Sequence, residues 1–163
     1  MNKYSKQDQK LLATWAADCA ERALPFFEKL YPEDNRPRKA IEAGRTWVNT
    51  GVFRMAVIRG ASLAAHAAAR GAKEDDMACF AARAAGQAVA TAHVPQHAFG
   101  AAYYALKAIA AADPDNAKVM VAKERDWQSR HIPKHLRQEV LKRVIIQEND
   151  DRIVIKIPKG KDF

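Results

Sequence analysis

Alanine restricts the possible folds of this chain more than any other residue, since it supplies 33 of the 163 residues, against 7 glycines and 7 prolines. Alanine loses no side-chain entropy on entering a helix, so a chain this rich in alanine favours helix over strand. With 28% charged residues, the chain has no apolar run near the roughly 18 residues that a membrane span needs. A chain of this length can bury about two-thirds of its unfolded surface in one domain. We therefore expect an all-α protein.

The apolar pattern predicts about seven helices. Apolar side chains recur at three- and four-residue steps, and Pro, Gly, Asp and Asn separate these runs. The expected helices span about residues 5–31, 35–48, 52–70, 75–88, 96–112, 113–128 and 133–144. We expect Pro25 to kink or restart the first helix, Gly51 to help stop the second, and Gly71 to end the third in a left-handed conformation.

A faint internal repeat bears on how these helices pack. Glu33-Asp34 and Glu74-Asp75 are 41 residues apart, and alanines at three-residue spacing follow each pair. That period is typical of helical-hairpin solenoids. Two arrangements therefore stay open, a HEAT-like stack of hairpins and an irregular bundle.

The C-terminal residues differ in kind from the rest. The segment 152–157 is β-branched and partly alternating, which predicts an extended conformation. A single strand has no partner in an all-helical domain, so it packs on the helices, pairs with another chain or is disordered. We expect one helical domain over residues 1–148 and an extended tail over residues 149–163.

Two tryptophans and two cysteines mark the expected core. Trp15 and Trp47 lie on apolar stripes of their helices, so both are predicted to be buried. Cys19 and Cys79 also lie among apolar neighbours, as small core residues do, and we expect no disulfide between them. The start of the chain has no apolar stretch of about seven residues behind its positive charges, which is unlike a signal peptide. These features predict a cytoplasmic protein with reduced thiols.

The histidines offer no clean metal or catalytic motif. His93 and His97 have the spacing at which a helix presents two imidazoles to one metal, but Pro95 lies between them. His66 is the one plausible third ligand, and no acidic residue is near in sequence. The serines and cysteines lack a histidine–carboxylate setting, and no phosphate-loop or dinucleotide motif is present. We expect no metal, no cofactor and no catalytic residue, and we therefore expect that the protein is not an enzyme.

Charged residues gather on the first two predicted helices, where they form either a structural ion-pair network or a pocket for a polar ligand, with pairing favoured. They are Asp18, Glu21, Arg22, Arg36, Arg38, Glu42 and Arg45.

The net charge of +8 points to a further possibility. Segment 128–143 holds five basic residues against Glu139 alone. Four of the five, Arg130, Lys134, Arg137 and Lys142, recur at steps that should place part of their charge on one side of the seventh helix. Such a face steers an acidic partner or binds nucleic acid weakly and without reading sequence. A nucleic-acid-associated helical protein is therefore the alternative function.

Four stretches resemble, in order and spacing, a bacterial family of immunity proteins assigned to polymorphic toxin systems. They are LLATWAADCAER (11–22), PEDNRPRKAIEAGRTW (32–47), AGQAVATAHVPQHAFGAAYYALKA (85–108) and ERDWQ (124–128). The resemblance extends to about residue 145 and does not include the C-terminal tail. It implies an all-α protein that neutralises a toxin by binding it, without catalysis.

Carried onto this chain, the resemblance implies a set of binding residues: Asp18, Arg22, Arg36, Arg38, His93, His97, Tyr104 and Lys107. Their mixture of aromatic and paired charge suits a structural network as well as a binding site. A functional polar patch would lie near Arg36, Arg38, His93 and His97. Because the chain is basic, the toxin should be neutral or acidic where it docks.

Overall fold

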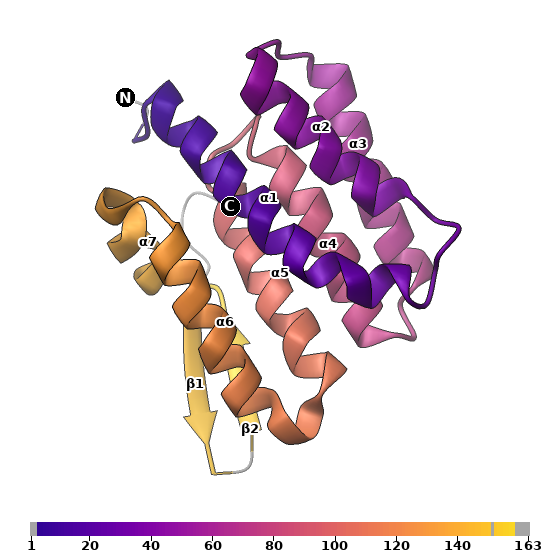
Figure 1. Cartoon of the computed structure of the whole chain (residues 1–163), viewed down its shortest axis with the longest axis vertical. Helices are drawn as coiled ribbons and strands as arrows, with labels where there is room; N and C mark the ends of the chain where they lie inside the picture. The colour runs from indigo at the N-terminus through magenta and orange to yellow at the C-terminus, as the bar shows by residue number, and fades with distance from the viewer. Residues whose placement is uncertain (1–2, 151, 159–163) are drawn as a thin grey trace.

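The computed structural model describes residues 3–150 and 152–158, and most of them are helical (Figure 1). The elements are α1 (Lys6–Glu28), α2 (Arg36–Thr50), α3 (Met55–Gly71), α4 (Asp76–Ala90), α5 (His97–Ala112), α6 (Ala117–His131), α7 (Arg137–Arg143), β1 (Ile145–Asn149) and β2 (Arg152–Lys156). Short 3-10 turns precede α6 and α7. The predicted all-α fold with seven helices is confirmed. None of the described helices has the length and apolar character to cross a membrane.

The α4 helix lies at the centre of the molecule and packs against α1, α2, α3 and α5. Its buried surface is mostly alanine, and Ala81, Ala84 and Ala85 are fully buried. Side chains this small let several helices approach α4 closely from different sides. The α1 helix also contacts α5 and α6 as well as α2 and α4. In a solenoid each repeat contacts only its neighbours, so this protein is a bundle rather than a HEAT-like stack.

The first helix ends earlier than the sequence predicted but is uninterrupted. At its start the Ser5 hydroxyl accepts the Asp8 N–H at 3.0 Å, and the Asp8 carboxylate accepts the Ser5 N–H at 3.1 Å. The helix then runs without interruption through Pro25 to Glu28, so the alternative that Pro25 restarts the helix is wrong. Leu24 and Phe27 are buried on either side of Pro25. Their packing holds the last turn helical although Pro25 has no N–H to donate.

Of the two glycines expected to end helices, Gly51 has a left-handed conformation and Gly71 does not. Gly51 has φ 69° and donates its N–H to the Trp47 carbonyl at 2.8 Å, which closes α2. Gly71 is the last residue of α3 and has no positive φ, so its predicted left-handed cap is wrong. Buried Ala72 donates instead to the carbonyls of Ala68 and Ala69, which extends the helical turn beyond Gly71.

The core contains the residues that the apolar stripes indicated. Trp15 is 2% exposed and Trp47 is 8% exposed, which confirms the predicted burial of both. Cys19 and Cys79 are buried free thiols, as expected. Burial raises the pKa of the Cys19 thiol well above its ordinary value, so the group is uncharged.

The C-terminal segment forms a hairpin, since β2 pairs antiparallel with β1 from Ile145 opposite Lys156 to Asn149 opposite Arg152. The expectation that a single strand lacks a partner in this chain is therefore wrong. The sequence pattern did not predict β1 as the partner strand, because β1 ends in the polar residues Gln147, Glu148 and Asn149 and follows a helix directly. Isoleucines of both strands pack against the helical core, as the packed-tail alternative predicted. Residues 151 and 159–163 of the predicted tail lie outside the described residues.

The seventh helix is shorter than predicted because its first residues form a 3-10 turn. Val140 and Val144 are buried in the core, whereas Leu141 is 44% exposed. The change of helix type shifts the angular position of each following side chain.

Candidate functional site

Three helix segments surround a surface cavity of about 310 Å³, which we call the histidine pocket. The α3 helix contributes one wall, and the C-terminal end of α4, the turn after it and the start of α5 contribute the other. Its lining residues are Met55, Ile58, Arg59, Ser62, Leu63, His66, Gln87, Ala90, His93 and His97. Three histidines thus meet at a cavity whose α3 wall is largely apolar.

Two glycines inside helices make room for the polar side chains of the pocket. A Cβ on Gly86 would lie 2.8 Å from His66 Nε2, and a Cβ on Gly100 would lie 2.7 Å from Gln87 Oε1. Real Cβ atoms do not approach other atoms this closely, so both side chains need a glycine opposite them. Glycine inside a helix is less favourable than alanine by about 0.5–1 kcal/mol. The fold thus accepts two unfavourable helix residues at the positions that accommodate His66 and Gln87.

Hydrogen bonds fix the orientation of the pocket's polar groups. His97 Nδ1 is 2.7 Å from Gln87 Oε1, and because an amide oxygen accepts, Nδ1 carries the proton in this contact. The Ser62 hydroxyl donates to the Gly86 carbonyl at 3.0 Å, which joins α3 to α4 beside the glycine. The site is therefore formed before any partner arrives.

Burial also determines the charge of the imidazoles. It lowers the pKa of His66, and the positive charges of Arg83 and Arg70 lower it further. Burial is likewise the main cause of the lowered pKa of His97, with a smaller contribution from His93. Both rings are therefore neutral at pH 7.

Exposed apolar side chains concentrate beside this pocket. Among the described residues, nine large apolar side chains are exposed, and five of them lie between Val52 and Leu63. Met55 and Leu63, at 43% and 55% exposure, both line the pocket. We call these two residues the apolar rim. Exposed apolar residues clustered next to a cavity are typical of an interaction surface.

The predicted ion-pair network between the first two helices exists in part. Arg45 donates to Asp18 at 2.8 Å and also pairs with Glu21, which links α2 to α1. Near the other end of α1, Arg38 pairs with Glu28. Each of these cations is matched by a carboxylate of the same protein, which is the arrangement of a structural network.

Arg36 pairs with Asp34, just before α2, at 2.6 Å. Its guanidinium is thus engaged next to its own helix start and does not reach the histidines.

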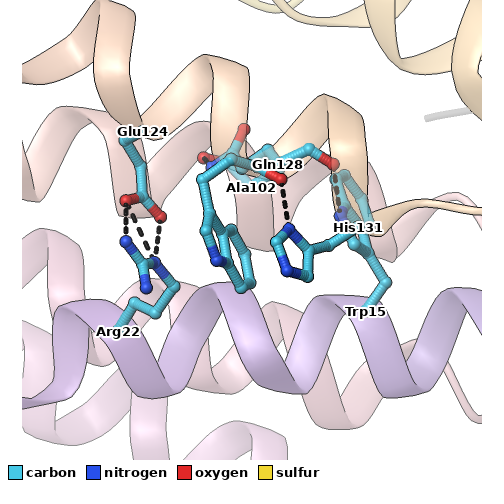
Figure 2. Close-up of polar contacts among 7 residues, drawn as sticks. Trp15, Arg22, Ala102, Glu124, Gln128 and His131 are labelled. Atoms are coloured by element: carbon cyan, nitrogen blue, oxygen red, sulfur yellow. Dashed lines mark hydrogen bonds and ion pairs between the residues drawn. The ribbon is translucent and has the colours of Figure 1, made fainter.

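Arg22 belongs to a different cluster, at the place where α6 packs on α1 and α5 (Figure 2). Its guanidinium donates twice through Nε and once through Nη2 to the carboxylate of Glu124, which is only 5% exposed. It also lies over the Trp127 ring, 4.1 Å from the centroid. Arg22 therefore compensates a buried charge between helices, a role that the spacing within α1 alone did not indicate.

The same interface holds a buried glutamine. Trp15 Nε1 donates to the Gln128 carbonyl at 3.0 Å, and Gln128 Nε2 donates to the Ala102 carbonyl at 3.2 Å. Gln128 is fully buried, so these bonds tie α6 to two helices at once (Figure 2). This second cluster is structural.

Tyr104 and Lys107 lie apart from both clusters, on the side of α5 that faces Phe80 of α4. Tyr104 stacks on Phe80 with centroids 6.2 Å apart, and Lys107 Nζ is 4.3 Å from the same ring centroid. Phe80 and Lys107 also line a wider groove beside β2. These two predicted binding residues thus share a surface with each other but not with the histidines.

The predicted patch of Arg36, Arg38, His93 and His97 is not assembled. Gln9 of α1 donates to the carbonyls of Thr91 and Ala92, so His93 lies near the start of α1, whereas Arg38 pairs with Glu28 at its end. Gln9 and Glu28 are 19 positions apart in the sequence, which corresponds to about 28 Å of helix.

Sequence reasoning missed Arg59 and Gln87 as pocket residues and considered His66 only as a metal ligand. The available signal was the pair of glycines, Gly86 and Gly100, inside otherwise strong helical patterns. Among the described residues, no group of three His, Cys, Asp or Glu side chains is placed to hold a metal ion.

The basic segment is divided among three elements. Arg130 lies on α6 and pairs with Asp126 at 2.8 Å, Lys134 lies in the 3-10 turn, and Arg137 and Lys142 lie on α7. Only Arg137 and Lys142 of the four lie on α7 itself, so the part of the charge that one side of this helix can carry is limited to these two.

The fold and the pocket together define a small helical bundle in which three histidines and an exposed apolar rim meet at one cavity. A family model described as "Imm-5 like putative immunity protein" matches residues 2–135, and the chain belongs to this family. The match ends before the C-terminal hairpin. No curated protein and no solved structure matches the chain.

Proposed function

We propose that this protein binds a bacterial toxin and neutralises it without catalysis, and that the contact surface is the histidine pocket with its apolar rim. Membership of the immunity protein family supports the general role. The observation that carries the choice of surface is the exposure of Met55 and Leu63 beside a cavity of about 310 Å³.

Exposed apolar side chains contribute favourable free energy to binding when a partner covers them and removes them from water. Burying apolar surface contributes about 25 cal/mol per Å², and the anchors of protein interfaces fill pockets near the interface centre. The pocket is rigid because Ser62, Gln87 and His97 are already hydrogen-bonded. A preformed site loses little conformational entropy on binding.

The encounter takes place in the cytoplasm of the producing cell. The buried free thiols of Cys19 and Cys79 suit a reducing compartment. Bound toxin is blocked because its own surface is covered, so no bond is made or broken in either protein.

The test measures toxin affinity and rescue of growth when the chain is co-expressed with a candidate toxin taken from the neighbouring open reading frame. Leu63→Asp places a charge in the apolar rim, and we expect at least a tenfold loss of affinity, which corresponds to about 1.4 kcal/mol. Leu141→Asp is the matched control, since Leu141 is 44% exposed on α7. Equal affinity of the two variants would contradict the proposed surface, and no toxin binding by the unmodified chain would contradict the proposed function.

A further inference from the structure

We propose that the histidine pocket receives a carboxylate-bearing side chain of the toxin, with its apolar stem against α3 and its charge facing Arg59 and the imidazoles. This inference rests on the proposed function and adds to it the chemistry of the group that the pocket recognises. Three observations carry it: the distribution of charge, the freedom of Arg59 and the apolar wall.

The part of the chain that builds the pocket is almost without negative charge. From Ala43 to Ala112 the carboxylates are Glu74, Asp75 and Asp76, which adjoin one another. They lie at the turn between α3 and α4, whereas the pocket adjoins Gln87, about 16 Å further along α4. Asp75, moreover, accepts a hydrogen bond from the Tyr31 hydroxyl. None of the residues that line the pocket is a carboxylate, whereas Arg59 lines it, so the lining carries positive and no negative charge.

The titratable side chains that act electrostatically on His66 and His97 are all basic. His66 is influenced by Arg70 on its own helix, by Arg83 of α4 and by His97 of α5. His97 is influenced by His93. A carboxylate entering this environment is attracted by the guanidinium groups, and by the imidazoles once they take up a proton.

Arg59 is the cation best placed to receive the ligand. It lines the pocket and is exposed, and it makes no ion pair with any residue in the described part of the chain. By contrast, Arg22, Arg38 and Arg45 each pair with a carboxylate of this protein. A guanidinium can bind a carboxylate through two parallel N–H donors, which makes it a selective receptor for that group.

The apolar wall favours a carboxylate on a hydrocarbon stem over a free inorganic anion. Met55, Ile58 and Leu63 form this wall, and Ile58 is only 3% exposed. A cavity of about 310 Å³ is at the small end of ligand pockets, which suits one side chain better than an extended ligand.

Proton uptake should accompany binding. A bound carboxylate favours the protonated imidazole, so it raises the pKa values of His66 and His97 that burial lowers in the free protein. Affinity should therefore increase as the pH falls from 8 toward 6, as long as the carboxylate itself remains ionised.

The experiment uses hexanoate as the probe, with the five histidine Cε1–H signals followed by NMR on the full chain. We expect the signals of His66, His93 and His97 to shift saturably with a Kd on the order of 1 mM, a value suited to a ligand of this size. The signals of His131 and His135 should not move. Hexanamide, which has the same stem without the charge, and inorganic phosphate, which has charge without the stem, should each bind about tenfold more weakly or not at all.

Two variants make the test specific. Arg59→Gln should weaken hexanoate binding about fivefold, whereas Arg152→Gln, a change at an exposed arginine on the hairpin, should leave it unchanged. Equal binding of hexanoate and hexanamide, equal binding of phosphate, no shift of the pocket histidines, or full affinity in Arg59→Gln would each overturn the proposal.

A final arm links the probe to the toxin. Hexanoate that fills the pocket should weaken toxin binding, and unchanged toxin affinity under that condition would overturn the assignment of the pocket to a toxin carboxylate. Because the hexanoate titration contains no toxin, a negative result there does not affect the outcome of the neutralisation assay, which tests the proposed function separately. A chain that binds hexanoate but no toxin instead contradicts the proposed function.

Discussion

Replacing Gly86 with alanine tests whether this glycine exists to accommodate His66. An open helix position supplies the reference, because a Cβ on Gly60 of α3 meets nothing within 4 Å. Gly60→Ala should therefore stabilise the protein by about 0.5–1 kcal/mol, the ordinary gain on replacing glycine inside a helix. At Gly86 the new Cβ would lie 2.8–2.9 Å from three atoms of the His66 ring.

The ring must then turn toward the pocket. Moving a side chain about 30° off its preferred rotamer costs about 0.5–1.5 kcal/mol, which cancels the helical gain. We expect Gly86→Ala to have a stability close to that of the unmodified chain and about 1 kcal/mol below that of Gly60→Ala. In a domain of this size that difference corresponds to about 2–4 °C in Tm.

Urea unfolding followed by tryptophan fluorescence measures these differences, since Trp15 and Trp47 are buried in the folded state. The His66→Ala and Gly86→Ala/His66→Ala pair completes the cycle, because without the ring the alanine at 86 should recover its helical gain. If Gly86→Ala stabilises the protein as much as Gly60→Ala does while His66 is present, the reasoning about this glycine is refuted.

Four further predictions concern stability, pH, metal and nucleic acid. Trp15→Ala should destabilise the fold by about 3–5 kcal/mol in urea unfolding, because the ring is 2% exposed, and a loss below about 1 kcal/mol would be inconsistent with its packing. Burial lowers the pKa values of His66 and His97, so below the ordinary histidine pKa the unfolded chain binds more protons than the folded protein does. The free energy of unfolding should therefore fall as the pH drops through about 6.5, and His66→Gln should make this dependence on pH less steep. Dialysis against a chelator should leave Tm unchanged, and a drop that zinc restores would contradict the expectation of no metal. Duplex and single-stranded DNA should bind to the protein weakly and lose affinity as the salt concentration rises. Submicromolar binding that disappears when Arg130, Lys134, Arg137 and Lys142 are changed to glutamate would favour the nucleic-acid alternative.

The helices could be predicted from the sequence because their causes are local. Alanine content, apolar periodicity and the Ser5–Asp8 cap act within a few residues, and Gly51 stops α2 through its own φ of 69°. The burial of Trp15 follows from the same periodicity, since a side chain on the apolar stripe of a helix faces the core.

Which charged groups pair was decided by tertiary structure. The sequence around Arg22 does not distinguish it from any other exposed arginine of the chain. It nevertheless pairs with Glu124, 102 residues away, because α6 packs against α1 at this position. Similarly, β2 pairs with β1, a segment whose polar residues do not predict a strand from the sequence pattern.

The histidine pocket shows the same division. The sequence by itself determined that α3, α4 and α5 form, and that a glycine lies inside each of them. Only the packing of these helices brought His66, Gln87 and His97 around one cavity and kept Arg38 at the far end of α1. The physical reason is that a helix fixes the relative positions of residues a few turns apart, whereas distances between helices depend on how whole buried surfaces fit together.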